Sequence, residues 1–64
     1  MTPLEINLIL RNTAALPLVV MRHGVSWRLT FESSQDAWIG FQALRGAGAA
    51  VEQDDNTHLL VEGL

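Results

Sequence analysis

Residues 18–32 read LVVMRHGVSWRLTFE and form the clearest structural unit in the sequence. Its first part, residues 18–22, is short, apolar and rich in β-branched side chains, as strands are. Its last part, residues 27–32, alternates apolar and polar residues without a fault, which is typical of a half-buried strand. The four residues His23-Gly24-Val25-Ser26 lie between the two parts and hold the glycine that a tight return needs. The stretch therefore predicts a β-hairpin with the odd-numbered side chains of 27–32 pointing inward.

A helix is predicted directly after this hairpin, over about residues 34–45. Ser33 is a good N-cap, and Asp36 follows at the third helical position, where it favours the positive end of the helix dipole. One apolar stripe at helical spacing can pack on a sheet, and it consists of Ala37, Gly40, Phe41 and Leu44. Gly40 has no side chain, so we expect the helix to approach the sheet closely there. Gly46 is expected to end the helix in the left-handed conformation.

The opening segment carries two conflicting signals. Apolar residues occupy every second position from Leu4 to Leu10, and this period of two predicts a strand over residues 4–11. The segment also begins with Thr2-Pro3-Leu4-Glu5, which looks like the capping box of a helix. We take periodicity as the stronger signal and predict a strand, with a helix as the alternative.

The tail is expected to form a second hairpin. Strands over residues 48–53 and 58–62 would be joined by a turn at Asp54-Asp55-Asn56-Thr57, since Asp and Asn suit turns. The whole chain, residues 1–64, is thus predicted as one small α+β domain. Its elements follow the order strand, strand, strand, helix, strand, strand, and the single helix packs on one face of an antiparallel sheet.

Composition narrows the classes of function. Of the 64 residues, 48% are hydrophobic and 17% are charged, which is enough apolar material for a core. The chain has no cysteine, so disulfides, thiolate metal sites and cysteine nucleophiles are excluded. The longest apolar run is far shorter than the roughly 20 residues of a membrane helix, and the start lacks a signal-peptide pattern. We therefore expect a cytoplasmic protein that does not contact a membrane.

The charge balance disfavours nucleic acid as a direct partner. Seven acidic residues outnumber four arginines, and the formal net charge is −3. Affinity for a duplex comes largely from neutralising its phosphates, which an acidic chain does poorly. Arg22 and Arg28 flank the same predicted hairpin, so a local basic patch remains open at this point.

One short motif suggests catalysis. The string VMRHGVS over residues 20–26 places Arg22-His23-Gly24 after an apolar strand. This arrangement resembles the signature of the phosphoglycerate mutase and acid phosphatase superfamily, in which the histidine becomes phosphorylated and the arginine holds the phosphate. That family also uses a second histidine, further arginines and an acid on a much larger domain, and here only His58 remains as a second histidine. A phosphohistidine phosphatase is therefore the last of our alternatives, and we predict no catalytic residues.

No metal or cofactor is expected either. The only candidates for a cation are the two histidines together with the acidic residues of the tail. Their spacing matches neither a zinc motif nor a calcium loop. The acidic residues are better explained as a solvated hairpin tip.

The candidate partner-binding residues lie in the predicted helix and in the tail. Relative to the apolar stripe, Trp38 lies at the edge and Ile39 on the far side, where both could contact another chain. Partial burial of Trp38 under the opening segment is the alternative. Glu52, Asp54, Asp55 and Glu62 are expected to gather near one end of the domain and to attract a basic surface.

The small size of the chain indicates a partner. A domain of about 60 residues is marginally stable, and burying apolar surface against another chain is the remaining way to gain stability. We therefore predict a non-enzymatic, acidic interaction module that binds a larger protein, with a homodimer as one form. Its more specific version is an inhibitor that covers a basic, nucleic-acid-binding surface, as small phage-type antagonists do. Self-assembly through edge strands, with residues 4–11 as a candidate edge, is the alternative.

Overall fold

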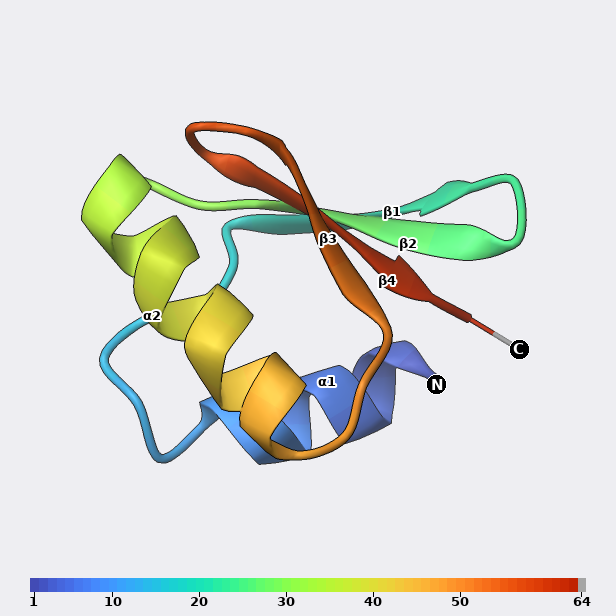
Figure 1. Ribbon diagram of the computed structural model, residues 1–64, viewed down its shortest axis with the longest axis horizontal. Coiled ribbons are helices and arrows are strands. Elements are labelled where there is room, and N and C mark those ends of the chain that lie inside the picture. The colour runs from blue at the N-terminus through green and yellow to red at the C-terminus, as the bar shows by residue number, and fades with distance from the viewer. Residues whose placement is uncertain (64) are drawn as a thin grey trace.

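The computed structural model describes residues 1–63 as two layers, a four-stranded antiparallel sheet and two helices on one of its faces (Figure 1). The elements in chain order are α1 (Pro3–Leu10), β1 (Val19–His23), β2 (Ser26–Thr30), α2 (Ser34–Gly46), β3 (Val51–Asp55) and β4 (His58–Glu62). The strand order is β1-β2-β4-β3, so β1 and β3 form the two edges. The predicted α+β class is confirmed, although the chain begins with a helix where we predicted a strand.

The predicted strand over residues 4–11 is wrong, because this segment forms α1. The conflicting signal, the capping box, is present in full. The Thr2 Oγ1 atom accepts a hydrogen bond from the Glu5 backbone N–H at 3.2 Å, and the Glu5 carboxylate accepts one from the Thr2 backbone N–H at 3.1 Å. Pro3 occupies the first helical turn, where its missing N–H has no cost.

The alternating apolar residues of α1 consequently divide between core and surface. Ile6 and Leu10, four residues apart, lie on one side of the helix and are fully buried. Leu4 and Leu8 lie on another side and are 68% and 49% exposed. The alternation that suggested a strand therefore places apolar side chains on the surface of the helix as well. We call Leu4 and Leu8 the ridge of α1.

The first hairpin is confirmed with shifted bounds. The strand β1 covers 19–23 instead of 18–22 and β2 covers 26–30 instead of 27–32, so the connection shortens to Gly24 and Val25. Leu29 lies opposite Val20, and Trp27 lies opposite Arg22. In the two-residue turn Gly24 has a φ of +63° and Val25 does not have a positive φ, which is the pattern of a type II′ turn. Such a turn matches the natural twist of the two strands.

The helix α2 begins where it was predicted to begin and contacts the sheet as predicted. The Ser33 Oγ atom accepts a hydrogen bond from the Asp36 backbone N–H at 3.1 Å. A Cβ atom added to Gly40 would lie 2.7 Å from Cζ of Phe31, so the missing side chain does permit a close approach.

The predicted end of this helix needs correction. Gly46 is the last helical residue and lacks a positive φ, whereas Gly48, with a φ of +88°, is the left-handed residue. The Gly48 N–H donates to the Arg45 carbonyl and the Ala49 N–H donates to the Leu44 carbonyl, each at 3.0 Å. These two bonds form a Schellman motif, which sets the cap two residues later than predicted.

The second hairpin is present with shifted bounds. The strand β3 runs over Val51–Asp55 instead of 48–53, so Asp54 and Asp55 lie in a strand and the turn shortens to Asn56-Thr57. The Asp55 Oδ1 atom accepts a hydrogen bond from the Thr57 backbone N–H at 2.9 Å, which starts the turn at Asp55. The register shifts between Gln53 and Asp55, as a β-bulge does.

The core fills the space between the sheet and the helices. All of its fully buried members are apolar, and they are Ile6, Leu10, Ala15, Leu29, Phe31, Ala37, Leu44, Leu59 and Val61. Among residues 1–63 no polar or charged residue is buried, so polar side chains lie at the surface or half-buried at the rim of the core.

Candidate interaction surfaces

The first candidate surface lies on the outer side of α2. Trp38 is 53% exposed, and its ring stacks on that of Phe41 with centroids 5.7 Å apart and planes 14° from parallel. The Arg45 guanidinium lies over the Phe41 ring, 6.0 Å from its centroid. Gln42 and Gly46 complete the lining of a shallow hollow at this place. We call Trp38, Phe41 and Arg45 the α2 surface.

Ile39 does not belong to this surface. It is half-buried and packs against the core, so its predicted orientation on the far side of the helix is wrong. The reason is that α2 touches both the sheet and α1, and therefore buries a wider face than one stripe. Phe41, which the sequence assigned to the inward-facing stripe, is half-buried and packs against the core, while its ring also stacks on that of Trp38.

The acidic residues of the predicted tip are exposed, but two of them already have partners within the chain. Asp54 Oδ2 accepts a hydrogen bond from Arg28 Nε at 2.8 Å, and Asp55 Oδ1 lies 2.6 Å from His58 Nδ1. The hydrogen bond with His58, followed by that from the Thr57 backbone, lowers the pKa of Asp55 below its ordinary value. The charge at this end of the sheet is thus partly balanced by Arg28.

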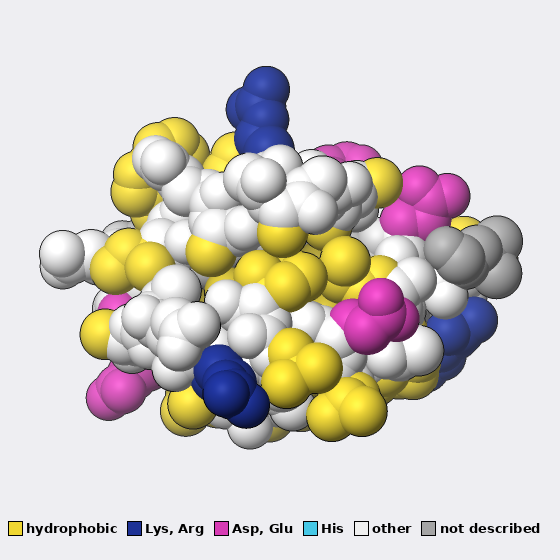
Figure 2. Space-filling view, turned by 90° about the horizontal axis from the view of Figure 1, so that it is seen from below, with side chains coloured by type: hydrophobic (Ala, Val, Ile, Leu, Met, Phe, Trp, Pro, Cys, Tyr) yellow, Lys and Arg dark blue, Asp and Glu magenta, His cyan; other side chains and the backbone are white. Residues whose placement is uncertain are grey.

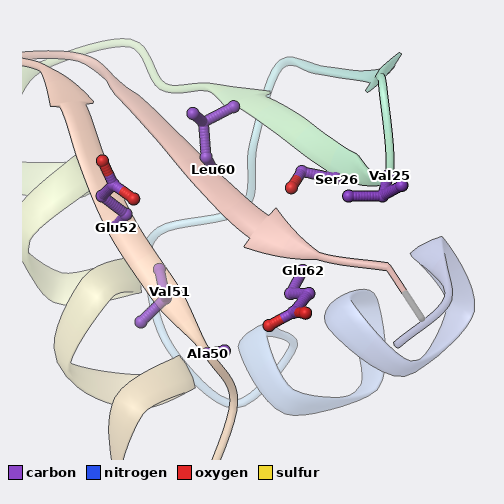
Figure 3. Close-up of a pocket in the computed structure, with 7 residues that line it drawn as sticks. All are labelled: Val25, Ser26, Ala50, Val51, Glu52, Leu60 and Glu62. Atoms are coloured by element: carbon purple, nitrogen blue, oxygen red, sulfur yellow. The ribbon is translucent and has the colours of Figure 1, made fainter.

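Glu52 and Glu62 lie on the outer face of the sheet beside a shallow hollow that spans β2, β3 and β4 (Figure 3). Among residues 1–63 neither carboxylate has an ion-pair partner. Their carboxylates point in different directions and do not converge on one place (Figure 3). Glu62 lies at the end of β4 and Asp55 pairs with His58 at its start, so the predicted gathering of the acidic residues at one end is wrong for Glu62. In the same part of the chain, no group of three or more His, Cys, Asp or Glu residues could hold a metal ion.

The structure does not bring the two histidines together. His23 pairs with Ser26 at the start of β2, and His58 pairs with Thr30 at its end. Ser26 and Thr30 are four positions apart, which is about 13 Å along the strand at roughly 3.3 Å per residue. The Arg22-His23-Gly24 string therefore lies in an exposed hairpin, far from the second histidine that the phosphohistidine hypothesis would use.

The two arginines of the first hairpin lie on opposite faces of the sheet. Arg22 pairs with Trp27, and its guanidinium lies 4.9 Å from the centroid of the indole ring. Arg28 is the next residue along β2, so it points to the outer face, where it meets Asp54. The basic patch that the sequence left open does not form.

A further surface was missed by the sequence interpretation. The exposed fractions of four apolar side chains in and beside β1 are 64% for Leu18, 45% for Val19, 61% for Met21 and 55% for Val25. We call these four residues and the backbone of β1 the β1 edge. The sequence feature that could have revealed the β1 edge is the apolar run at 18–21. In a strand covered on one face every second side chain points outward, so a continuous apolar run leaves some apolar side chains exposed.

Hydrophobic side chains are also visible from the helical side of the molecule. Figure 2 shows them spread across this face, with single basic and acidic side chains between them.

Comparison of the chain with protein-family models, curated proteins and solved structures finds no match. Within residues 1–63, both helices fall short of the length and apolar character that a membrane span requires.

Proposed function

We propose that this chain is a non-enzymatic interaction module that binds a larger protein in the cytoplasm through exposed apolar side chains. The observation that carries this proposal is the set of large hydrophobic residues on the surface, which are Leu4, Leu8, Leu16, Leu18, Val19, Met21, Val25 and Trp38. Single exposed hydrophobic residues are normal, but grouped ones are typical of contact sites. All of these except Leu16 fall on the ridge of α1, the β1 edge or the α2 surface.

The α2 surface is the best anchor for a partner. Trp38 is stacked on Phe41, so little side-chain freedom is lost when another chain covers it. Tryptophan and arginine are the residue types most often found at binding hot spots. Arg45 adds a positive charge beside the rings, which favours a partner with an apolar side chain next to a carboxylate.

Affinity capture from the source cell, followed by mass spectrometry, tests this proposal. Trp38→Ser is expected to abolish capture of the partner, because it removes the largest exposed apolar side chain. Gln35→Ser is the matched control, since Gln35 is exposed on the same helix but lies outside the α2 surface. If Trp38→Ser, Met21→Ser and the double variant Leu4→Ser, Leu8→Ser all retain the same captured proteins, the proposal is wrong.

A second candidate is an inhibitor that covers a basic, nucleic-acid-binding surface. Glu52 and Glu62 favour it, because both carboxylates lie on the open face of the sheet without an ion-pair partner in residues 1–63. Asp54 and Asp55 would add charge to this face, although both already contact Arg28. Such a surface would speed association with a basic partner and make it sensitive to salt.

Variants that neutralise acidic side chains distinguish inhibition through charge from binding through apolar side chains. The double variant Glu52→Gln, Glu62→Gln is expected to slow association and to flatten its dependence on salt, while leaving the internal ion pairs intact. Glu32→Gln is the control, because Glu32 is exposed outside these strands. Association kinetics that the double variant leaves unchanged would eliminate the inhibitor.

A further inference from the structure

The hydrogen bonds of β2 determine which backbone groups of β1 face outward. The Phe31 N–H donates to the Thr57 carbonyl at 2.7 Å, and the Gly63 N–H donates to the Val25 carbonyl at 2.8 Å. Val25 and Phe31 flank β2 directly, so the odd-numbered positions along this strand bond toward β4. Because bonding direction alternates along an antiparallel strand, its even-numbered residues bond toward β1.

Val20 and Arg22 consequently present their backbone to the open side of the sheet. The even-numbered residues of β2 pair with Val19, Met21 and His23, which use their N–H and C=O groups inside the hairpin. Val20 and Arg22 alternate with these residues, so each directs one N–H and one C=O outward. Among the described strands, only β2 pairs with β1, and the outward groups face no further strand.

These outward groups are complementary to those of a second copy. If two β1 strands run antiparallel with Val20 of one opposite Arg22 of the other, both N–H groups donate and both C=O groups accept across the interface. The two-fold axis then passes beside Met21, which faces the same residue of the second copy. Centring the axis on Arg22 would place two guanidinium groups opposite one another, and centring it on Val20 would pair Arg22 with Leu18, outside β1.

We propose that two copies of this chain pair through β1 in the register centred on Met21 and form one continuous eight-stranded sheet. This inference goes beyond the proposed function, because its partner is a second copy of this chain and not a larger protein. The side chains of the β1 edge agree with it. Met21 would lie against Met21 of the second copy, and Leu18 would lie beside the turn that holds Val25, so exposed apolar side chains would be covered.

The one charge in β1 does not obstruct this pairing. An inward-pointing charge is a common protection of sheet edges against association. Here the guanidinium of Arg22 lies over the Trp27 ring, which holds it against the helical face of its own chain. The outer positions of the strand carry Val19, Met21 and His23, and none of them is acidic or a lysine.

The opposite edge of the sheet is protected. Its strand β3 carries Glu52, Asp54 and Asp55 and contains the register shift next to Gln53. Acidic side chains and bulges are both devices that block edge-to-edge association. Pairing confined to one edge with two-fold symmetry gives a closed dimer and not an open fibre.

Sedimentation equilibrium over a dilution series tests the register. Wild-type chain is expected to be a dimer that dissociates on dilution. Met21→Lys and Met21→Glu should each raise the dissociation constant at least about tenfold, because like charges would lie directly opposite. An equimolar mixture of the two variants should recover a dimer that contains one copy of each. Leu4→Lys is the matched control, since Leu4 is as exposed as Met21 but lies on α1, and it should dimerise like the wild type.

Three results would overturn the inference. They are a wild-type chain that stays monomeric up to about 1 mM, a dimer that both Met21 variants leave intact, and a mixture of these variants that forms no mixed dimer. The wild type could instead be monomeric and capture a larger protein that the Met21→Lys variant no longer captures. This result would overturn self-pairing but leave the proposed function standing. A Met21-dependent dimer that captures no larger protein would support self-pairing and remove the larger partner.

Discussion

Gly40 of α2 lies so close to the ring of Phe31 that a Cβ atom on it would be 2.7 Å from Cζ and 2.9 Å from Cε2. Phe31 belongs to the core and is only 2% exposed, so its ring cannot move into solvent. The helix and the sheet are therefore held at a separation that requires glycine at this position. This contact connects α2 to the residue that directly follows β2.

Gly40→Ala is expected to lower the free energy of unfolding by about 1–3 kcal/mol, because the added methyl group overpacks the core. The loss should appear even though alanine favours a helix over glycine by about 1 kcal/mol. Urea denaturation measures it. Gly46→Ala is the control, since among the described residues no atom beyond its own stretch of helix lies within 4 Å of its Cβ position, and it should be neutral or stabilising. Equal effects of the two changes would show that the Phe31 ring does not set the separation.

Trp27→Phe should loosen the first residues of the chain. The indole Nε1 donates a hydrogen bond to the Met1 carbonyl at 3.0 Å and so fastens the start of the chain to β2. Phenylalanine retains an aromatic ring but has no donor, and we expect a loss of about 1 kcal/mol or more in the free energy of unfolding. Hydrogen exchange should quicken more at the Ile6 amide of α1 than at the Leu44 amide of α2. Equal acceleration at both amides would contradict a local role for this bond.

Asp55→Asn should change how stability depends on pH. Hydrogen bonds from His58 and Thr57 lower the pKa of Asp55 in the folded chain. Its contribution to stability is therefore complete above the unfolded pKa of about 3.9 and is lost as the pH falls through the folded pKa. Thermal unfolding curves of wild type and variant should differ above about pH 4 and converge on further acidification. A difference in melting temperature that stays constant down to the lowest pH would contradict this linkage.

Sequence patterns predicted the structure correctly where periodicity and capping residues agree. The alternation in residues 27–32 predicted a strand that the structure has over Ser26–Thr30, and the predicted cap at Ser33 was confirmed. In residues 4–11 the period of two and the capping box disagree, and the cap prevailed because α2 offers a surface for Ile6 and Leu10. A helix of eight residues is marginal in isolation, so this outcome depends on tertiary packing that the local pattern does not contain.

The interaction surfaces were less predictable than the fold. Trp38 could be named from its position at the edge of the predicted apolar stripe, and it is exposed. The pairing of Arg28 with Asp54, which are 26 positions apart in sequence, depends on the strand order and on the bulge in β3. The β1 edge depends on the strand order as well, because only that order makes β1 an outer strand.

Thr2→Ala tests whether the cap decides the structure of the opening segment. The Thr2 hydroxyl and the Glu5 carboxylate each satisfy a backbone N–H at the start of α1. Loss of the hydroxyl should cost about 1 kcal/mol in the free energy of unfolding and reduce the helical circular dichroism signal. Thr2→Ser keeps the hydroxyl and should behave like the wild type. If the alanine and serine variants are equally stable, the cap does not stabilise α1. The burial of Ile6 and Leu10 would then be the interaction that makes this segment a helix despite its alternating sequence.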